Sequence, residues 1–157
     1  MLLASDMTTE GSFYVSTTGA LPMPVDRRDA VLPEEVLSRL TRQHPNILLV
    51  GPAAFTDAAL KLIEPLVHHP IAWWMPNEKR TVPVGTFATL IIGRVDAADA
   101  EQQNHLCDWF DKRPGHAQVV STAVTPLFPL IQAGTFLESL YYRLNHVCVL
   151  SDSPSRS

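Results

Sequence analysis

Gly134-Thr-Phe-Leu-Glu-Ser-Leu-Tyr-Tyr-Arg-Leu-Asn145 is a helical pattern that leads directly into an apolar run, His146-Val-Cys-Val-Leu150. Phe136, Leu140 and Leu144 recur at helical spacing, so we expect them on the buried face of a helix. The apolar run that follows is typical of a strand covered on both faces of a sheet. A helix followed by a buried strand is the building unit of α/β proteins.

The same alternation continues back toward the amino terminus. Four earlier apolar runs predict strands, at 47–50, 71–74, 90–92 and 119–120. Helical patterns begin at Pro33, Thr56, Asp99 or a neighbour, Thr125 and Thr135. We expect Thr56 to cap its helix and Pro65 to kink or end that helix. Strands that alternate with helices predict an α/β domain with a five-stranded, mostly parallel sheet.

The length of 157 residues suits one domain. Residues 1–32 are rich in Ser, Thr, Gly and Pro, so we expect a flexible N-terminal segment with Phe13-Tyr14-Val15 as a short added strand. The domain itself is expected over residues 33–150. The polar residues 151–157 are expected to form a disordered tail.

The composition narrows the classes of function. A formal net charge of −4 disfavours direct binding to nucleic acid, which usually requires a basic surplus. The sequence has no secretory signal, and no apolar stretch approaches the ~20 residues of a membrane span. Cys107 and Cys148 are expected to be reduced thiols, with Cys148 in the core. These features predict a cytoplasmic location.

Segments of this chain resemble, in order, the ATPase core of bacterial sigma-54 activators, the enhancer-binding proteins of the AAA+ class. The run 134–145 is the most specific match. The other matching segments correspond to the phosphate-loop strand, the second strand, the Walker B strand, the helix after it and the strand before sensor I, at 46–51, 69–73, 89–92, 101–106 and 117–122. The resemblance implies a P-loop NTPase/AAA+-like three-layer sandwich over roughly residues 34–150, with the Walker strands central and the helical lid lacking.

The phosphate-loop positions depart from the family. A loop of the form G-x-x-x-x-G-K-[ST] supplies backbone N–H groups, a lysine for the phosphates and a hydroxyl for Mg²⁺. Counted from Gly51, this chain has Thr56 at the second glycine, Asp57 at the lysine and Ala58 at the hydroxyl. A carboxylate beside a triphosphate costs on the order of several kcal/mol. Gly51 is therefore a vestigial phosphate-loop position, and we expect no cofactor.

The Walker B and sensor positions depart as well. In the family the Walker B strand ends in an acidic pair that holds Mg²⁺ and activates water. Gly93 and Arg94 align with that pair here, and neither can bind a cation. Asp96 is expected to be a turn or helix-cap residue. At the sensor position, Ala123-Val124 stands where the family has a polar side chain.

The family also has two arginines in the closing run that reach toward the nucleotide of a neighbouring subunit. The first aligns with Leu137 and is lost, whereas the second aligns with Arg143 and is kept. We expect Arg143 to form a structural pair with Glu138 or Ser139, one helical turn earlier. Arg143, Tyr141 and Tyr142 are the candidate subunit or partner contacts: the resemblance implies an intersubunit arginine at Arg143, and tyrosine is enriched at interfaces.

Two larger parts of the family pattern are missing from the sequence. Only residues 75–88 separate the second predicted strand from the Walker B segment at 89–92, and they lack the GAFTGA loop that contacts sigma-54 in the family. After Leu150 the family would continue into a helical lid and usually a DNA-binding helix-turn-helix, and we expect this chain to lack both.

Other kinds of site find no support. No spacing among the six histidines matches a zinc site, so we expect no metal. Neither a G-x-S-x-G motif nor a triad-like arrangement is present. A phosphoacceptor receiver domain would need acids after the first and third strands, where Gly51-Pro52 and Gly93-Arg94 stand instead.

The resulting hypothesis is a degenerate, truncated sigma-54-interaction-type AAA+ domain: a bacterial pseudo-ATPase that acts in transcription regulation or signalling through protein–protein contacts and is not an enzyme. Its partner would be itself, as a homo-oligomer, an intact AAA+ activator or a signalling protein, with no direct nucleic acid and no membrane. Two alternatives stay open. One is a sigma-54-dependent transcription regulator with residual ATP binding, and the other is a self-assembling scaffold unrelated to transcription.

Overall fold

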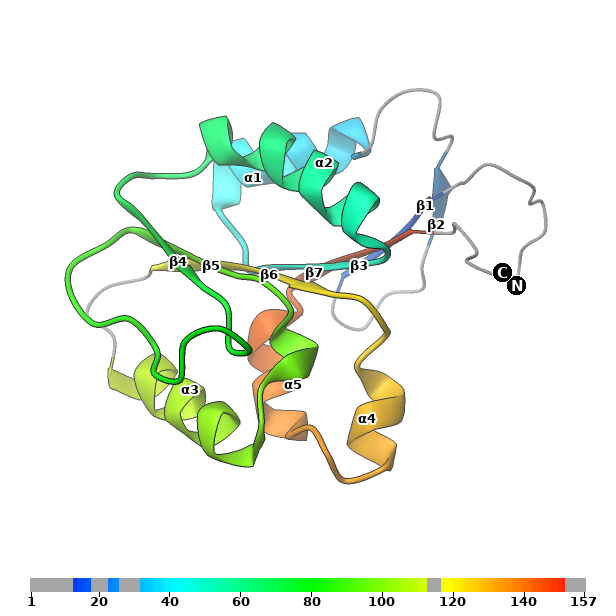
Figure 1. Ribbon diagram of the computed structural model, residues 1–157. Coiled ribbons are helices and arrows are strands. Elements are labelled where there is room, and N and C mark those ends of the chain that lie inside the picture. The colour runs from blue at the N-terminus through cyan, green and yellow to red at the C-terminus, as the bar shows by residue number, and fades with distance from the viewer. Residues whose placement is uncertain (1–12, 18–22, 26–31, 113–116, 152–157) are drawn as a thin grey trace.

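The computed structural model describes residues 13–17, 23–25, 32–112 and 117–151. The strands in these residues form one sheet, in the order β2-β1-β7-β3-β6-β5-β4 (Figure 1). Their bounds are Phe13–Thr17 (β1), Met23–Val25 (β2), Ile47–Val50 (β3), Ile71–Trp74 (β4), Thr89–Ile92 (β5), Gln118–Ala123 (β6) and Val147–Ser151 (β7).

The strands β7, β3, β6, β5 and β4 are parallel neighbours, which confirms the predicted five-stranded parallel sheet. The strands predicted at 47–50 and 71–74 have those bounds in the structure. The strand predicted at 119–120 is longer, because β6 lies in the middle of the sheet and pairs on both sides. The two expected Walker strands, β3 and β5, flank β6 and are therefore central.

The short strand predicted at Phe13-Tyr14-Val15 is confirmed as the start of β1, which pairs antiparallel with β7. β2 then pairs antiparallel with β1, so these two short strands add an antiparallel edge to the parallel sheet. Ser151, which the sequence places in the tail, is the last residue of β7. The rest of that tail, 152–157, lies outside the described residues, so its expected disorder stays a prediction.

Helices cover both faces of the sheet and make the predicted three-layer sandwich (Figure 1). α1 and α2 lie on one face, and α3, α4 and α5 lie on the other. None of the helices found in the described ranges is long and apolar enough to cross a membrane. The helix bounds are Glu34–Gln43 (α1), Ala53–Ile63 (α2), Glu64–Leu66 (η2), Val95–Ala97 (η3), Ala100–Lys112 (α3), Phe128–Gln132 (α4) and Glu138–Leu144 (α5), where η marks a 3₁₀ helix.

Each face of the sheet has its own apolar cluster. Successive side chains of a strand point to opposite faces. In β3, Ile47 and Leu49 therefore pack with residues of α1 and α2, whereas Leu48 and Val50 pack with residues of α3 and α5. All four side chains are buried, which explains why the sequence of β3 is continuously apolar.

The closing run folds as a turn followed by α5. Phe136, Leu140 and Leu144 are buried in the second apolar cluster, which confirms them as core residues. The helix begins at Glu138 rather than at the predicted Thr135. Gly134 adopts a left-handed backbone with φ of 80° and closes α4, with its N–H donating to the Ile131 carbonyl at 3.0 Å.

The start of α2 also differs from the prediction. Thr56 does not cap the helix, because α2 begins at Ala53 with Pro52 as its N-cap residue. The Thr56 hydroxyl donates instead to the Ala53 carbonyl at 3.3 Å, inside the first turn. The predicted effect of Pro65 is confirmed, since α2 ends at Ile63 and Pro65 lies in the 3₁₀ turn that follows.

A reciprocal cap fixes the start of α3 at Asp99, as predicted. The Gln102 N–H donates to Asp99 Oδ1 at 2.9 Å, and the Asp99 N–H donates to Gln102 Oε1 at 3.0 Å. The hydrogen bond from the Gln102 backbone, together with the Arg80 guanidinium at 2.8 Å, lowers the pKa of the Asp99 carboxyl below its ordinary value.

Candidate functional site

The connection between β3 and α2 occupies the place of the expected phosphate loop. Only Gly51 and Pro52 separate these two elements, so the positions aligned with the loop's lysine and hydroxyl lie inside the helix. The N–H groups of Phe55 and Thr56 donate to the Pro52 carbonyl at 2.9 and 3.0 Å. A phosphate loop needs such N–H groups to point at its ligand. Here the first turn of α2 uses them.

Gly51, the vestigial phosphate-loop position, is enclosed by neighbouring side chains. Its N–H donates to the Ala123 carbonyl at 2.9 Å and extends the pairing of β3 with β6. A Cβ atom added at Gly51 would lie 2.6 Å from the Ser151 Cβ and 2.9 Å from Cδ2 of the buried Phe55. Glycine is required at this position because a ring and a neighbouring strand approach its backbone closely.

The end of β5 holds the two positions that align with the Walker B acids. A Cβ atom added at Gly93 would lie 3.1 Å from the Met75 Cγ, so Met75 fills the space beside this glycine. Arg94 has a left-handed backbone with φ of 60°, which turns the chain from β5 into η3. The Arg94 N–H donates to Thr122 Oγ1 at 3.0 Å. These contacts make the strand end a packed turn.

Asp96 neutralises Arg94 at this turn. Its Oδ1 and Oδ2 accept hydrogen bonds from Arg94 Nε at 3.1 Å and Nη2 at 3.3 Å, and Oδ2 also accepts from the Val124 N–H at 3.4 Å. The Asp96 side chain is 6% exposed and the Arg94 side chain 44%. The predicted role of Asp96 as a turn residue is confirmed, because it lies in η3 and joins the ends of β5 and β6.

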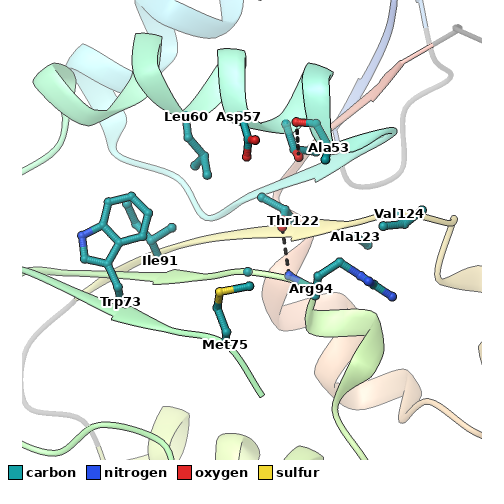
Figure 2. A pocket seen from close by; sticks show the side chains of 12 residues that line it. Ala53, Asp57, Leu60, Trp73, Met75, Ile91, Arg94, Thr122, Ala123 and Val124 are labelled. Carbon is teal, nitrogen blue, oxygen red and sulfur yellow. Dashed lines mark hydrogen bonds between the residues drawn. The ribbon is translucent and has the colours of Figure 1, made fainter. Parts of the chain in front are cut away.

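A cavity of about 340 Å³ opens at the carboxyl ends of β4, β5 and β6, next to α2 (Figure 2). Ligands of open α/β sheets bind in crevices at this edge. Trp73, Met75 and Val124 line the cavity and are among the exposed large apolar side chains, with Trp73 53% exposed. Leu60 and Ile91 add further apolar surface. The wall is therefore mostly apolar and partly open to solvent.

Two charged residues that lie far apart in the sequence line this cavity. Asp57 comes from α2 at the aligned position of the phosphate-loop lysine, and Arg94 comes from the end of β5 at an aligned acidic position. Figure 2 shows Asp57 pointing from α2 toward the sheet, whereas the Arg94 side chain extends away from Trp73. The family of the resemblance has a lysine at the position of Asp57 and an acid at the position of Arg94. The charges at the two positions are therefore exchanged in this chain.

The residues that form the cavity wall were not predicted from the sequence, although the adjacent pair Trp73 and Trp74 indicated part of it. Trp73 and Trp74 are adjacent in β4, so their side chains must face opposite sides of the sheet. Trp74 is buried, with its indole N–H donating to the Lys79 carbonyl at 2.9 Å. Trp73 points to the side of α2 (Figure 2), and on the edge strand β4 it stays 53% exposed. An adjacent tryptophan pair at a strand end therefore indicated one exposed ring.

Arg143 forms a structural pair, but not with the predicted partners. Its Nη2 lies 2.7 Å from Asp111 Oδ1 of α3, and its Nη1 donates to the Cys107 carbonyl at 3.1 Å. The guanidinium carbon lies 5.7 Å from the Phe110 ring centroid. Pairing with Glu138 or Ser139 was wrong because α5 packs its Arg143 face against α3, which offers a carboxylate at closer range.

Tyr141 and Tyr142 lie beside each other on α5, with ring centroids 5.4 Å apart. Tyr142 is 51% exposed and Tyr141 is half-buried. Partial burial raises the pKa of the Tyr141 hydroxyl above its ordinary value. Their proposed role as partner contacts, with Arg143, stays a prediction. All three lie on the α3 side of the sheet, away from the cavity beside α2.

The cysteines and histidines form no further centre in the described residues. Cys148 is buried in the core as predicted, and this burial raises its pKa to about 12. Among the residues that the structure describes, no three His, Cys, Asp or Glu side chains lie close enough to hold a metal ion. His44 and His68 have ring centroids 4.2 Å apart.

No protein-family model matches the chain, and no curated protein matches its sequence. Its fold is similar to crystal structures of NtrX from Brucella abortus: a complex with ATP (TM-score 0.62, 18% identity), a complex with ADP (0.62, 17%) and a further structure of the same protein (0.59, 16%). Each match covers 74% of this chain and 34% of NtrX, so the chain spans about a third of that protein's length. The chain thus has the predicted α/β fold, a parallel sheet between two layers of helices, and part of NtrX has a similar fold.

Proposed function

We propose that this chain is a non-catalytic AAA+-like domain that works as a protein-interaction module in transcription regulation or signalling. The observation that carries the proposal is the exchange of charges in the cavity, where Asp57 and Arg94 stand at the aligned lysine and acidic positions. A triphosphate would meet the Asp57 carboxylate, a repulsive contact that is only partly screened in a cavity beside apolar walls. Arg94 offers Mg²⁺ no ligand atom, and its guanidinium is already paired with Asp96.

The packing around Gly51 supports the same proposal. The short connection from β3 to α2 gives no loop that could wrap around phosphates, and the Phe55 ring lies against Gly51. The site is therefore changed in shape as well as in charge. Restoring a lysine at Asp57 alone would leave both the helix start and the ring in place.

The link to transcription rests on the fold and on the run 134–145. NtrX is a sigma-54-dependent AAA+ response regulator, and its fold is similar to that of this chain. A domain that keeps this scaffold without the ATPase residues would act by contact with a second copy, an intact AAA+ activator or a signalling protein. The partly exposed apolar wall formed by Trp73, Met75 and Val124 gives such a contact a place to form.

The first experiment is a calorimetric titration of the chain with ATP and Mg²⁺. NtrX from Brucella abortus, which was crystallised with ATP, is the positive control under the same conditions. We expect no saturable heat from this chain. Saturable one-to-one binding would overturn the proposal and favour the alternative with residual ATP binding.

The second experiment captures partners from the native host by pull-down and mass spectrometry, with light scattering for the oligomeric state of the purified chain. Recovery of sigma-54 or an intact activator would support the transcription link. A closed homo-oligomer that captures no other protein would favour the alternative of a self-assembling scaffold.

A further inference from the structure

The Asp57 carboxylate forms no hydrogen bond or ion pair with any residue that the structure describes. It stands on the exposed side of α2 and points toward the cavity (Figure 2). Lys61 lies one helical turn further along α2, but it does not line the cavity and no ion pair joins it to Asp57. The cavity therefore contains one carboxylate whose hydrogen-bonding capacity is unused by the described structure.

The second charged group of the cavity is already neutralised. Asp96 holds the Arg94 guanidinium in two hydrogen bonds, at 3.1 and 3.3 Å, and is itself buried. An anion that approached Arg94 would have to compete with this pair. The net charge available to a ligand in the cavity is consequently negative, and it is located at Asp57.

The opposite wall has the surface that a flat cation prefers. Trp73 is 53% exposed and lines the same cavity as Asp57. An arginine guanidinium stacks on aromatic faces and forms two parallel hydrogen bonds with a carboxylate. Its aliphatic stem packs on apolar side chains such as Met75 and Leu60, which also line the cavity. The volume of about 340 Å³ is near the lower end of ligand pockets, which suits one long side chain better than a nucleotide.

We propose that the cavity receives an arginine side chain of a protein partner, with its guanidinium held by Asp57 and its plane against Trp73. The inference rests on the proposed function, because it names the chemistry of the partner that this interaction module recognises. The site that holds an anion in the family of the resemblance thus becomes a site for a cation. The charge at one helix position, Asp57, determines this change.

The test uses N-acetyl-arginine methylamide as the probe and follows the indole N–H signals of ¹⁵N-labelled chain by NMR. Trp73 lines the cavity, whereas Trp74 is buried and Trp109 lies on α3, so those two indoles are internal references. We expect the Trp73 signal to shift in a saturable way. The citrulline analogue has the same shape without the charge. We expect its affinity to be lower by at least about tenfold, because a charge-assisted hydrogen bond is lost.

Asp57→Asn is the decisive variant, and Glu64→Gln is its matched control. Glu64 is an exposed acid in η2, directly after α2, and it does not line the cavity. We expect Asp57→Asn to remove the difference between the arginine and citrulline probes, and Glu64→Gln to keep it. Equal shifts with both probes in the unchanged chain, or an arginine preference that survives in Asp57→Asn, would overturn the inference.

The failure of this inference can be told apart from the failure of the proposed function. Binding of ATP and Mg²⁺ by the unchanged chain would overturn the proposed function itself. Absence of ATP binding together with absence of arginine preference would overturn only the identity of the partner's side chain.

Discussion

Gln103 joins three separate segments of the chain through one buried side chain. Its Nε2 donates to the Ala98 carbonyl at 3.0 Å and to the Thr135 carbonyl at 2.9 Å, and its Oε1 accepts from the Leu137 N–H at 2.8 Å. Gln103 is 1% exposed and lies on α3. The turn before α5 is thereby fixed to α3. We predict that Gln103→Met, which keeps the length of the side chain but removes its polar atoms, destabilises the fold.

The expected magnitude follows from the three hydrogen bonds. Each net hydrogen bond contributes about 1 kcal/mol, and a buried group left without a partner costs about 1–3 kcal/mol. The bond to Ala98 is fully buried, whereas the bonds to Thr135 and Leu137 are partly accessible, so water can replace Gln103 there. We therefore expect a loss of about 3 kcal/mol in the free energy of unfolding. For a chain of this length the melting temperature would fall by roughly 6–12 °C.

Equilibrium unfolding in urea, followed by circular dichroism, measures this loss. Gln132→Met is the matched control, because Gln132 is exposed at the end of α4 and undergoes the same chemical change. We expect the control to change stability by less than about 0.5 kcal/mol. If Gln103→Met lost less than about 1 kcal/mol while the control behaved as expected, hydrogen bonding by Gln103 would not be what fixes the turn.

Three other changes test separate parts of the structure. Gly51→Ala should lower the free energy of unfolding by about 1–3 kcal/mol, because its Cβ would overlap with Phe55; an unchanged urea midpoint would refute this packing. Arg143→Ala should cost about 1 kcal/mol at low salt and less at high salt, since its pair with Asp111 is partly exposed; a loss independent of salt would contradict an ion-pair role. The lowered pKa of Asp99 means that its carboxylate stabilises the fold above its ordinary pKa of 3.8 and that this stabilisation is lost as pH falls through the folded-state value. The unchanged chain should therefore be more stable than Asp99→Asn at neutral pH, and this difference in stability should disappear in acid. Thermal melts across pH would show both.

The central strand β3 could be predicted because it is buried at all four positions and is therefore continuously apolar. The edge strand β4 is only partly buried, but its run Ile71–Trp74 is also apolar, and both strands were located with the bounds that the structure has. Helix starts were harder to predict. Thr56 has a favourable side chain for a cap, but Pro52 directly after Gly51 already fixes the backbone for a helix, and α2 begins before Thr56.

The candidate site was predictable only as a set of positions. The sequence places Asp57 and Arg94 at the positions aligned with the phosphate-loop lysine and a Walker B acid. It does not show that both residues line one cavity. Trp73 and Met75 lie at the end of β4 and Val124 follows β6, and only the order of β4, β5 and β6 in the sheet brings them together. The same applies to Arg143, whose partner Asp111 lies on another helix.

The amino-acid sequence determined the class of this protein: its alternating apolar runs require a parallel sheet between helices, and its substitutions at the phosphate-loop and Walker B positions change the charge of the site. These properties are local, since each depends on the type of residue at one position or on its spacing. The tertiary structure decided which side chains face one another. It encloses Gly51 beneath Phe55, neutralises Arg94 with Asp96 and leaves Asp57 unpaired among the described residues, beside an exposed Trp73. Such pairings depend on strand order and helix packing across the whole domain, so no short stretch of sequence contains them.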